Sequence, residues 1–532
     1  MVLRHPIRLP EGDMQNICSI KNLYFNIPDK PLFSGINIEL PRGYTGLVGN
    51  NGCGKSTFLE TLSGSLKPDQ GSITWYSDYL KVDQARDIPQ HRVVDIFDPK
   101  GLYDCFSRIE SGSYCEEDLI RVADSWELPT LWQQNLYSAG INLTLDTPVE
   151  NLSGGERVLL DLIHAFSHKN HYLLLDEPGN HLDSTGKEWL LQKIHNHRAG
   201  ILMVSHDREL LQQANTILEL NSEKLRTYGG NYSNYQEVKK IQGQSIERKI
   251  ENTKKKVNSL NKLKQSSSNK TATRRNQGKK LQGSQCKSLL DAKKDRAGRS
   301  LGKLSRNLDR QYQNLKQELE SAQKGHTIDQ PVSMHLNRVG LTGGIRLHLD
   351  GLKLPYGSYS ESLSFTMHSG DRWHIRGANG SGKSTLLKVI AGQLKPAGGL
   401  CRTFGSCFYL DQHLSQLNGK ISALENLTLL HPDTKTNYWR TALATLNIRG
   451  DSAFRPTNTL SGGERLKVVL LAATRGAEAP DLLLLDEPDN HLDLESRIAL
   501  ETALIEYPGT FLLISHDSSF VEKVGVNNEI CL

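Results

Sequence analysis

The segment GNNGCGKST occupies residues 49–57, and GANGSGKST occupies residues 377–385. Each has the pattern GxxxxGK[ST], and the first follows a strand-like run at 44–48 and precedes a helical run. In such a loop the glycines let backbone N–H groups converge on phosphates, the lysine adds a positive charge, and the next hydroxyl binds Mg²⁺. One match could be an ordinary glycine-rich turn, but two matches at equivalent places in a repeat favour nucleotide binding. The candidate phosphate-binding residues are Gly49, Asn50, Gly52, Gly54, Lys55, Ser56 and Thr57, and in the second copy Gly377, Asn379, Gly380, Gly382, Lys383, Ser384 and Thr385.

Three further motifs repeat in the same order. LSGGER is found at 152–157 and 460–465, a strand-like run ending in DEPxNHLD at 173–183 and 483–493, and SHD at 205–207 and 515–517. The glycine-rich loops are 328 residues apart but the LSGGER motifs only 308, so the first copy holds about 20 extra residues. We expect a short inserted element within 91–145 of a duplicated domain.

Strand-like runs alternate with helical stretches in both copies, which predicts an α/β fold with a largely parallel sheet in each. A chain of 532 residues also exceeds the size at which a single core stops growing. We therefore expect an N-terminal extension at 1–13, a first nucleotide-binding domain at 14–238, a joining segment at 239–332 and a second domain at 333–532.

The joining segment is strongly basic. Residues 239–324 contain 24 lysines or arginines and 7 acidic residues, so this stretch carries +17 while the whole chain carries only +5. Apolar residues recur every three or four positions from Leu301 to Leu319, and we expect a helical hairpin with a polar tip at 264–300. Such a hairpin could be a solvated spacer, but the acidic remainder of the chain favours RNA phosphates as its partner. The tip has no base-stacking aromatics, so charge and shape should outweigh sequence readout.

Paired acids follow the repeated strand-like run. We expect Asp176 and Asp486 to hold Mg²⁺, together with Ser56 and Ser384. The adjacent acids are candidates to orient or deprotonate the attacking water. The catalytic candidates are therefore Glu177 and Glu487, with His206 and His516, each 30 residues after its aspartate, as sensors of the γ-phosphate. By their positions in the repeat, Gln84 and Gln412 are candidate Mg²⁺ or water ligands.

The LSGGE motif separates this chain from other phosphate-loop enzymes, and the ordered set resembles the ATP-binding cassette superfamily over both repeats. The resemblance implies ATP and Mg²⁺ as cofactors and two ATP molecules held between cassettes packed head to tail. Each site would then use the signature residues of the opposite copy. It also implies an adenine-stacking aromatic, for which Tyr356 is the candidate in the second copy, whereas Tyr24, Phe25 and Ile27 remain open in the first. The signature residues are Ser153, Gly154 and Gly155, and Ser461, Gly462 and Gly463.

Two cassettes in one chain, a charged helical linker and NHLD after the glutamate resemble the ABC-F subfamily. This resemblance implies a cytoplasmic monomer with an intramolecular sandwich that hydrolyses ATP and acts at the ribosomal E site. The linker at 239–332 would reach toward rRNA and P-site tRNA, and the insertion matches the family's arm in position. The protein would be a translation factor or an antibiotic-resistance factor that protects ribosomes.

Other classes remain as alternatives, of which the ATPase subunit of a transporter is the strongest. The sequence has no apolar run of the length that spans a bilayer, and a +17 linker has no evident task in a transporter. A DNA-repair ATPase of the excinuclease type would carry zinc modules, but the eight cysteines form no CxxC pair and fit a reducing compartment. A lipid tether is disfavoured because the hairpin has no spare apolar face.

Overall fold

The computed structural model divides the chain into two compact units, Met1–Asn234 with Pro331–Leu532, and Tyr235–Gln330. The first unit contains both glycine-rich loops, and the second contains most of the joining segment. The residues described are 16–27, 30–82, 92–98, 100–180, 182–221, 224–280, 310–319, 343–378, 380–411, 414–446, 448, 450–460, 462–475, 480–490 and 492–532.

The first cassette is built on a six-stranded sheet with the order β5-β6-β7-β3-β8-β9. Its first five strands are parallel, and β9 pairs antiparallel with β8. Strands β3, β6 and β7 are buried along their whole length, as continuous apolar runs covered on both faces should be. The strands are β3 (Tyr44–Val48), β5 (Tyr79–Val82), β6 (Tyr172–Asp176), β7 (Ile201–Val204), β8 (Thr216–Asn221) and β9 (Lys224–Gly229).

An antiparallel sheet with the order β2-β1-β4 covers one side of the helix that follows the first glycine-rich loop. Its strands are β1 (Asn16–Ile27), β2 (Lys30–Pro41) and β4 (Gln70–Trp75), and the helix is α1 (Lys55–Leu62). Phe33 of β2 packs edge-on against Phe58 of α1, with ring centroids 5.7 Å apart. This contact joins the antiparallel sheet to the phosphate-loop helix in one core.

The second cassette repeats this plan. A five-stranded parallel sheet has the order β14-β15-β16-β12-β17, and an antiparallel sheet has the order β11-β10-β13. The parallel strands are β12 (Arg372–Arg376), β14 (Cys407–Leu410), β15 (Leu482–Asp486), β16 (Thr510–Ile514) and β17 (Asn528–Cys531). The antiparallel strands are β10 (Ile345–Lys353), β11 (Leu363–His368) and β13 (Gly398–Thr403). The α/β prediction with two tandem cassettes is confirmed.

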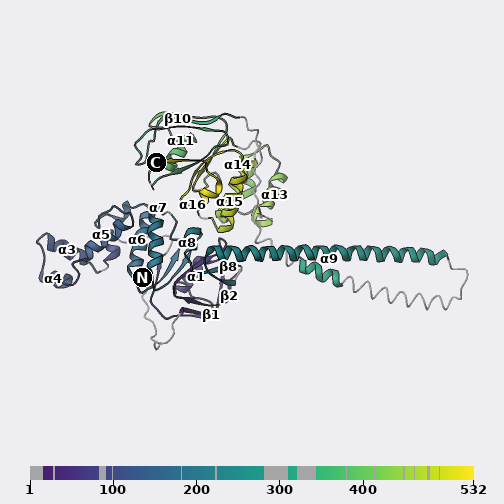
Figure 1. Cartoon of the computed structure of the whole chain (residues 1–532), viewed down its shortest axis with the longest axis horizontal. Coiled ribbons are helices and arrows are strands. Elements are labelled where there is room, and N and C mark those ends of the chain that lie inside the picture. Colours follow the sequence, from purple (N-terminus) through teal and green to yellow (C-terminus); the bar gives the residue numbers. More distant parts are fainter. Residues whose placement is uncertain are drawn as a thin grey trace. The chain divides into compact units, whose positions relative to one another are not determined.

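Helices complete each cassette (Figure 1). In the first they are α2 (Val94–Phe97), α3 (Leu102–Glu110), α4 (Glu116–Val122), α5 (Leu128–Ser138), α6 (Gly154–Ser167), α7 (Ser184–Asn196) and α8 (Arg208–Gln212). In the second they are α11 (Lys383–Ile390), α12 (Ala423–Leu430), α13 (Thr436–Thr445), α14 (Gly462–Arg475), α15 (Leu494–Glu506) and α16 (Ser518–Val524). Three short 3₁₀ turns lie at Val149–Asn151, Gly450–Ala453 and Thr457–Thr459. The extra residues of the first copy include α3 and α4, which pack together around Cys105, Phe106 and Val122.

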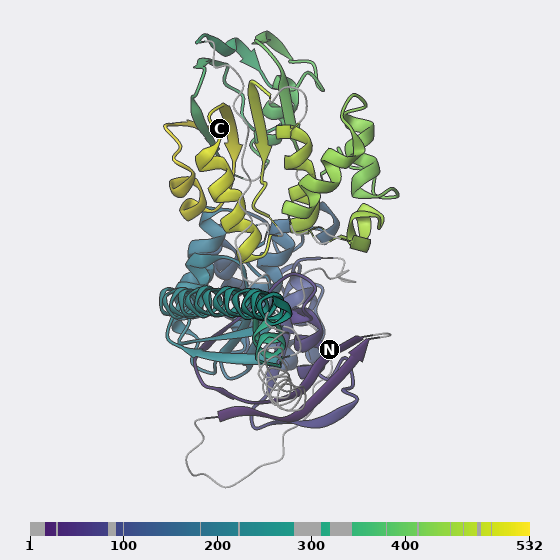
Figure 2. The ribbon, with the colours of Figure 1, turned by 90° about the vertical axis from the view of Figure 1, so that its right-hand side faces the viewer.

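The second unit contains most of α9 (Tyr232–Lys280) and a helical stretch at 310–319 (Figures 1 and 2). Lys249 Nζ of α9 lies 3.6 Å from Glu318 Oε1 of the second stretch, so the two helices run side by side there. The helix α9 continues to Lys280, well into the segment 264–300 that we expected to be the polar tip. This part of the sequence has no proline and only Gly278 as a strong helix breaker, and lysine, arginine and glutamine support helix without forming an apolar stripe. The rest of that tip lies outside the described residues.

Among the residues that the structure describes, no helix is both long enough and apolar enough to cross a membrane.

Candidate functional site

The predicted site residues gather at the carboxyl ends of three neighbouring strands in each cassette. In the first, the glycine-rich loop follows β3, Asp176 ends β6 and His206 follows β7, and β7 lies between the other two strands. In the second, β12, β15 and β16 carry the loop, Asp486 and His516 in the same arrangement. The carboxyl edge of a parallel sheet is where such folds bind ligands. Motifs up to 157 residues apart in the first copy therefore share one edge.

The two glycine-rich loops have the same backbone. Gly54 and Gly382 stand directly before α1 and α11 with φ angles of 97° and 112°, in the left-handed region that favours glycine. The Lys55 ammonium donates to Gly49 O at 2.8 Å and to Asn50 O at 3.3 Å. The Lys383 ammonium donates to Gly377 O at 2.8 Å and to Ala378 O at 2.9 Å. Both lysines are thus buried under their own loops at a helix N-terminus, where an anion is favoured.

The second cassette shows a set of oxygen ligands suited to Mg²⁺. The Ser384 hydroxyl donates to Asp486 Oδ1 at 3.0 Å, and the Tyr409 hydroxyl donates to Asp486 Oδ2 at 2.9 Å. Burial raises the pKa of the Asp486 carboxyl, which a divalent cation would counteract by favouring the charged form. A hydroxyl at the start of α11 and a carboxylate at the end of β15 are hard oxygen ligands of the kind that Mg²⁺ takes beside nucleotide phosphates, so these residues fit the ion.

The two candidate glutamates adopt an unusual backbone conformation. Glu177 and Glu487 have φ angles of 49° and 48°, and such values cost a non-glycine residue about 1–2 kcal/mol. Their amides donate to the neighbouring strands, at 2.9 Å to Val204 O and 3.0 Å to Ile514 O. The same left-handed turn in both copies directs each side chain toward its histidine. Strain that recurs at equivalent positions is typical of functional sites.

Each glutamate lies close to the predicted histidine of its own cassette. Glu177 Oε1 is 3.5 Å from His206 Nε2, and Glu487 Oε1 is 3.4 Å from His516 Nε2. Asn180 donates to Glu177 Oε2 at 2.8 Å, and Asn490 donates in the same way to Glu487. The structure therefore brings the four predicted catalytic residues together as two matching pairs, each held by the asparagine of its NHLD motif.

Burial determines the protonation of the first pair. It raises the pKa of Glu177, although Lys55 and the Asn180 hydrogen bond oppose the change. Burial lowers the pKa of His206 well below its usual value, and Lys55 and Arg497 act in the same direction. His206 is therefore neutral at pH 7. A neutral imidazole can donate one hydrogen bond and accept another, as a contact to a phosphate or water requires.

The LSGGER motifs lie at the start of α6 and α14. Ser153 caps α6: its hydroxyl accepts from the Glu156 amide, while the Glu156 carboxylate accepts from the Ser153 amide at 2.8 Å. Ser153 and Gly154 are exposed, and a Cβ at Gly154 would meet nothing within 4 Å. The predicted approach of each signature motif to the opposite glycine-rich loop remains a prediction.

The aspartates of the NHLD motifs take part in contacts between the cassettes. The Asn51 amide in the first glycine-rich loop donates to Asp493 Oδ2 of the second cassette at 3.0 Å. Asp183, its counterpart in the first cassette, lines a pocket with Gly377 and Ala378 of the second loop. Each loop is therefore approached by the segment that follows the candidate glutamate of the other copy.

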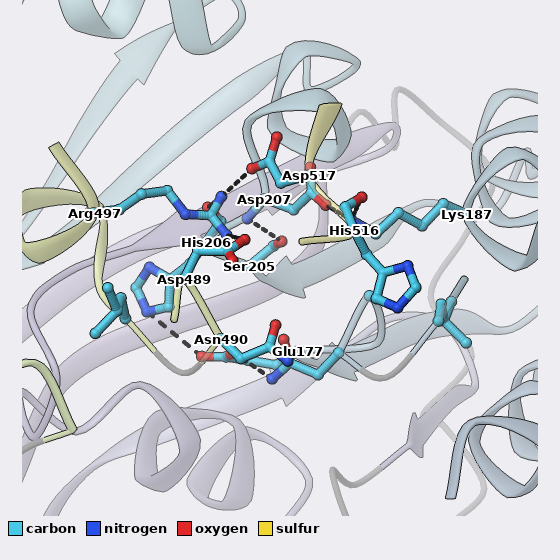
Figure 3. A pocket seen from close by; sticks show the side chains of 14 residues that line it. Glu177, Lys187, Ser205, His206, Asp207, Asp489, Asn490, Arg497, His516 and Asp517 are labelled. Atoms are coloured by element: carbon cyan, nitrogen blue, oxygen red, sulfur yellow. Dashed lines mark hydrogen bonds and ion pairs between the residues drawn. The ribbon is translucent and has the colours of Figure 1, made fainter. Parts of the chain in front are cut away.

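A second pocket is lined by both residues of the first glutamate–histidine pair and by the histidine of the second (Figure 3). Besides Glu177, His206 and His516, it is lined by Lys187 and Arg497, which lie four residues after the two NHLD aspartates. Sequence reasoning missed this lysine and arginine. Their identical offset from the repeated motif was the available signal, because both occupy the fourth position of their helices.

Some predicted residues lie outside the described part of the chain, and the candidate adenine-binding aromatics differ in exposure. Tyr356 is 68% exposed, as a ring open to stacking must be, whereas Tyr24 is 39% and Ile27 46% exposed. Thr57 and Thr385 lie in the first turns of α1 and α11. The predicted residues outside the description are Gln84, Asn379, Gln412 and Ser461.

Comparison with known proteins agrees with this geometry. Residues 33–180 and 360–490 each match the family described as ABC transporter. This chain belongs to that family. The matches cover both glycine-rich loops and both pairs of acids, and domains of this family are ATPases, so the chain is an ATP-binding, ATP-hydrolysing enzyme. The mixed α/β fold follows from the same finding.

Relatives of similar organisation align along most of the chain. "Probable ATP-binding protein YheS" of Escherichia coli K12 is 29% identical over 497 residues, covering 90% of this chain and 72% of its own length. "Ribosome protection protein VmlR" of Bacillus subtilis is 28% identical over 523 residues, covering 96% of this chain and 86% of its own length. The recognition of a tandem-cassette protein of the ABC-F type is confirmed.

A solved structure shows the same fold. The crystal structure of an archaeal ribosome recycling factor, aABCE1, in complex with a ribosomal stalk protein matches 96% of this chain and 87% of its own. The TM-score is 0.54 and the sequence identity is 19%. This likeness concerns the arrangement of two cassettes in one chain.

Proposed function

We propose that this ATPase acts on the ribosome, as a translation factor or as a protein that protects ribosomes from antibiotics. ATP closes the two cassettes, the closed protein binds at the E site, and the linker contacts rRNA and P-site tRNA. Hydrolysis then reopens the cassettes and releases the protein. The nucleotide thus shifts a population between two states that differ in ribosome affinity.

The observation that carries this proposal is the alignment to the ribosome protection protein VmlR over 96% of the chain, which includes the linker as well as the cassettes. A cassette ATPase from another class would share the nucleotide sites without a basic insertion between them. The linker therefore supports the ribosome as the partner.

The linker has the chemistry that this role requires. Helix α9 has 49 residues and so extends about 70 Å at 1.5 Å per residue. Lys254, Lys255 and Lys256 are exposed on it, while Ile250 and Thr253 are buried. A long helix with a narrow buried stripe and an exposed cationic surface can enter a crowded RNA environment and neutralise phosphates.

Within the cassettes we propose roles from the repeated motifs, supported by the geometry above where the structure describes it. Lys55 and Lys383 bind phosphates, with Ser56 and Asp176, or Ser384 and Asp486, as ligands of Mg²⁺, which would neutralise charge on the phosphate oxygens. Glu177 and Glu487 orient and deprotonate the attacking water, and His206 and His516 contact the γ-phosphate. Gln84 and Gln412 complete the ion's surroundings. Ser153–Gly155 and Ser461–Gly463 bind the phosphates of the opposite site, and Tyr356 stacks on adenine.

The glutamates provide a direct test. The double variant Glu177→Gln and Glu487→Gln keeps the shape of both side chains but removes the base, so it should bind ATP and hydrolyse it about 10²–10⁴-fold more slowly. With ATP it should cosediment with ribosomes, whereas wild-type protein should be released. The matched control is Glu110→Gln, an exposed acid on α3. The proposal is wrong if the double variant binds ATP but stays in the ribosome-free fraction, or if it collects with membranes.

The linker is tested by removing the same number of positive charges from the linker and from a cassette. Replacing Lys254, Lys255 and Lys256 by glutamine should weaken ribosome binding. The slope of log affinity against log salt concentration should also become shallower, by the equivalent of up to three phosphate contacts. The control replaces three exposed lysines of the second cassette, Lys395, Lys420 and Lys435. Equal losses in the two triple variants would contradict a specific role for the linker.

Drug resistance separates the two biological roles. We expect a ribosome-protecting protein to raise the inhibitory concentration of peptidyl-transferase inhibitors when it is expressed in a susceptible host. A variant with residues 264–300 shortened should lose that effect while keeping ATPase activity. Unchanged drug sensitivity with intact ribosome binding would favour the translation-factor role.

A further inference from the structure

Lys187 and Arg497 occupy equivalent positions in the repeat and make equivalent contacts (Figure 3). Lys187 Nζ lies 2.8 Å from Asp207 Oδ2, and Arg497 Nη1 forms an ion pair with Asp517. Asp207 and Asp517 directly follow the two candidate histidines in the SHD motifs. Each cation therefore holds the segment that carries the histidine of its own cassette.

The same two cations also reach the other cassette. Lys187 donates to the backbone carbonyl of His516 at 3.2 Å, and Arg497 donates to the carbonyl of His206 at 3.2 Å. The ion pair and the carbonyl contact of one cation thus each have a counterpart in the other, as expected for two repeated copies. Each SHD segment is held from both sides of the interface.

These contacts are buried and charged. The Lys187 and Asp207 side chains are each 12% exposed, and those of Arg497 and Asp517 are 8% and 6% exposed. Burial lowers the pKa of both cations, but the surrounding carboxylates, Asp207 for the lysine and Asp489 with Asp517 for the arginine, raise it by more. Both side chains are therefore positively charged at pH 7, and hydrogen bonds from buried charged donors are stronger than neutral ones.

We propose that Lys187 and Arg497 are reciprocal positioning residues, each of which sets the position of the candidate histidine in the opposite ATP site. The inference rests on the proposed roles of His206 and His516. Neither cation contacts its glycine-rich loop through any hydrogen bond described above, so the effect is on hydrolysis rather than on nucleotide affinity. Hydrolysis at one site then depends on how the other cassette holds its own helix, which couples the two sites.

The coupling is unequal because the second cassette has an additional carboxylate. Arg497 Nη2 lies 3.4 Å from Asp489 Oδ2, which also accepts from the Ser515 hydroxyl at 2.9 Å. The equivalent position in the first cassette is Gly179, so Lys187 has no such partner there. A planar guanidinium fixed by two carboxylates is held more rigidly than an ammonium held by one. The site of His206 should therefore depend more strongly on its cross-cassette cation.

The test measures each site separately in the full-length protein. In a Glu487→Gln background only the site of His206 is intact, and in a Glu177→Gln background only that of His516. Single-turnover hydrolysis of labelled ATP then reports one site at a time. Each background receives Lys187→Met or Arg497→Met, and the charge-preserving Lys187→Arg and Arg497→Lys serve as rescue variants.

The inference predicts losses in the opposite site. Arg497→Met should slow hydrolysis at the His206 site about tenfold or more, and Lys187→Met should slow the His516 site by a smaller factor, since a charge-assisted hydrogen bond is lost in each case. The dissociation constant for ATP should change less than twofold, and Arg497→Lys should restore most of the rate. The inference would be overturned if the hydrolysis rate fell only at the site of the cation's own cassette, where Asp517 pairs with Arg497 and Asp207 with Lys187. An equal fall in rate at both sites would also overturn it.

Failure of the proposed function gives a different result. If the double glutamine variant hydrolyses ATP at the wild-type rate, the assignment of Glu177 and Glu487 is wrong, and the inference falls with it. If the double variant is inactive and the methionine variants act only within their own cassettes, the site assignment stands and the reciprocal role alone is rejected. A methionine variant that does not fold will be recognised by its Tm. In that case the hydrolysis rates of Arg497→Lys and Lys187→Arg are compared at the two ATP sites in the same way.

Discussion

Asp493 of the second cassette accepts two backbone hydrogen bonds that serve different purposes. Its Oδ1 accepts from the Ser496 amide at 2.8 Å and caps α15, whereas its Oδ2 accepts from the Asn51 amide of the first cassette at 3.0 Å. One carboxylate therefore begins a helix of its own cassette and holds the glycine-rich loop of the other. Because the two oxygens act separately, the local and cross-cassette roles can be separated by mutation.

Asp493→Asn should uncouple the two roles. The amide oxygen can still cap α15, since asparagine is as good a cap as aspartate, but an NH₂ group cannot accept from the Asn51 amide. We expect hydrolysis at the first site to fall about tenfold, because a hydrogen bond to a charged group contributes about 1.5–3 kcal/mol. Steady-state ATPase assays in the Glu487→Gln background measure this. Asp493→Ser, which also caps, should behave alike, and unchanged rates in both variants would contradict the expectation.

A buried ion pair between the cassettes should control the stability of their contact. Arg208 Nη1 lies 2.6 Å from Glu501 Oε1, and each side chain is 7% exposed. Removing one partner leaves a buried charge unpaired, which costs about 3–5 kcal/mol, whereas a double apolar replacement avoids this penalty. We therefore expect Glu501→Leu to lower the Tm and the double variant Arg208→Met with Glu501→Leu to recover much of it. The control is Asp433→Ala, at an exposed position. A double variant less stable than the single one would show that the pair itself stabilises the contact.

The first glycine-rich loop should not tolerate a side chain at Gly54. Its φ angle is 97°, and an added Cβ would lie 2.8 Å from the Leu32 side chain. Gly54→Ala should cost about 1–2 kcal/mol for the left-handed backbone alone and should distort the loop as well. Gly64→Ala is the matched control, because its φ is 72° but its Cβ would meet nothing nearer than 4.0 Å. We expect both variants to lose stability in thermal unfolding and only Gly54→Ala to weaken ATP binding. Equal affinities would show that the loop adapts.

The buried His206 should make stability depend on pH. Its pKa in the folded protein lies well below the ordinary value of 6.5, so between these two values the unfolded chain binds more protons than the folded one. Stability then rises with pH in this range, and the contribution is lost as the pH falls below about 6.5. Lys55, Asp493 and Arg497 face the ring. We expect the Tm of wild type to drop more between pH 7 and pH 5.5 than that of His206→Gln. Parallel curves for wild type, His206→Gln and the exposed-site control His195→Gln would refute this.

Much of the fold could be predicted because each motif appears twice in the same order, so the interpretation of one copy can be checked against the other. The strand-like runs predicted before the glycine-rich loop and before the paired acids are strands, and β3 has the predicted bounds 44–48. Local patterns suffice here, since a buried parallel strand is a short continuous apolar run and a glycine-rich loop before a helix is encoded within nine residues. A helical linker could be predicted, but the extension of α9 to Lys280 could not. Helix-forming residues without an apolar stripe leave no periodic pattern in the sequence.

The sequence by itself determined that the chain holds two copies of one set of motifs, and it predicted from them which residues form the two nucleotide sites, because each motif is a local arrangement that appears twice. Only the tertiary structure decided which strands are neighbours, and thus that Glu177 lies 3.5 Å from His206. The tertiary structure alone shows that Asp493 accepts from the Asn51 amide. It alone also shows that Lys187 and Arg497 donate to the backbone carbonyls of the histidines in the opposite cassettes. These contacts join residues about 290–440 positions apart. The physical reason is that hydrogen bonds and ion pairs depend on distance in space, and a single lysine or arginine on a helix carries no local pattern that says which carbonyl it will meet.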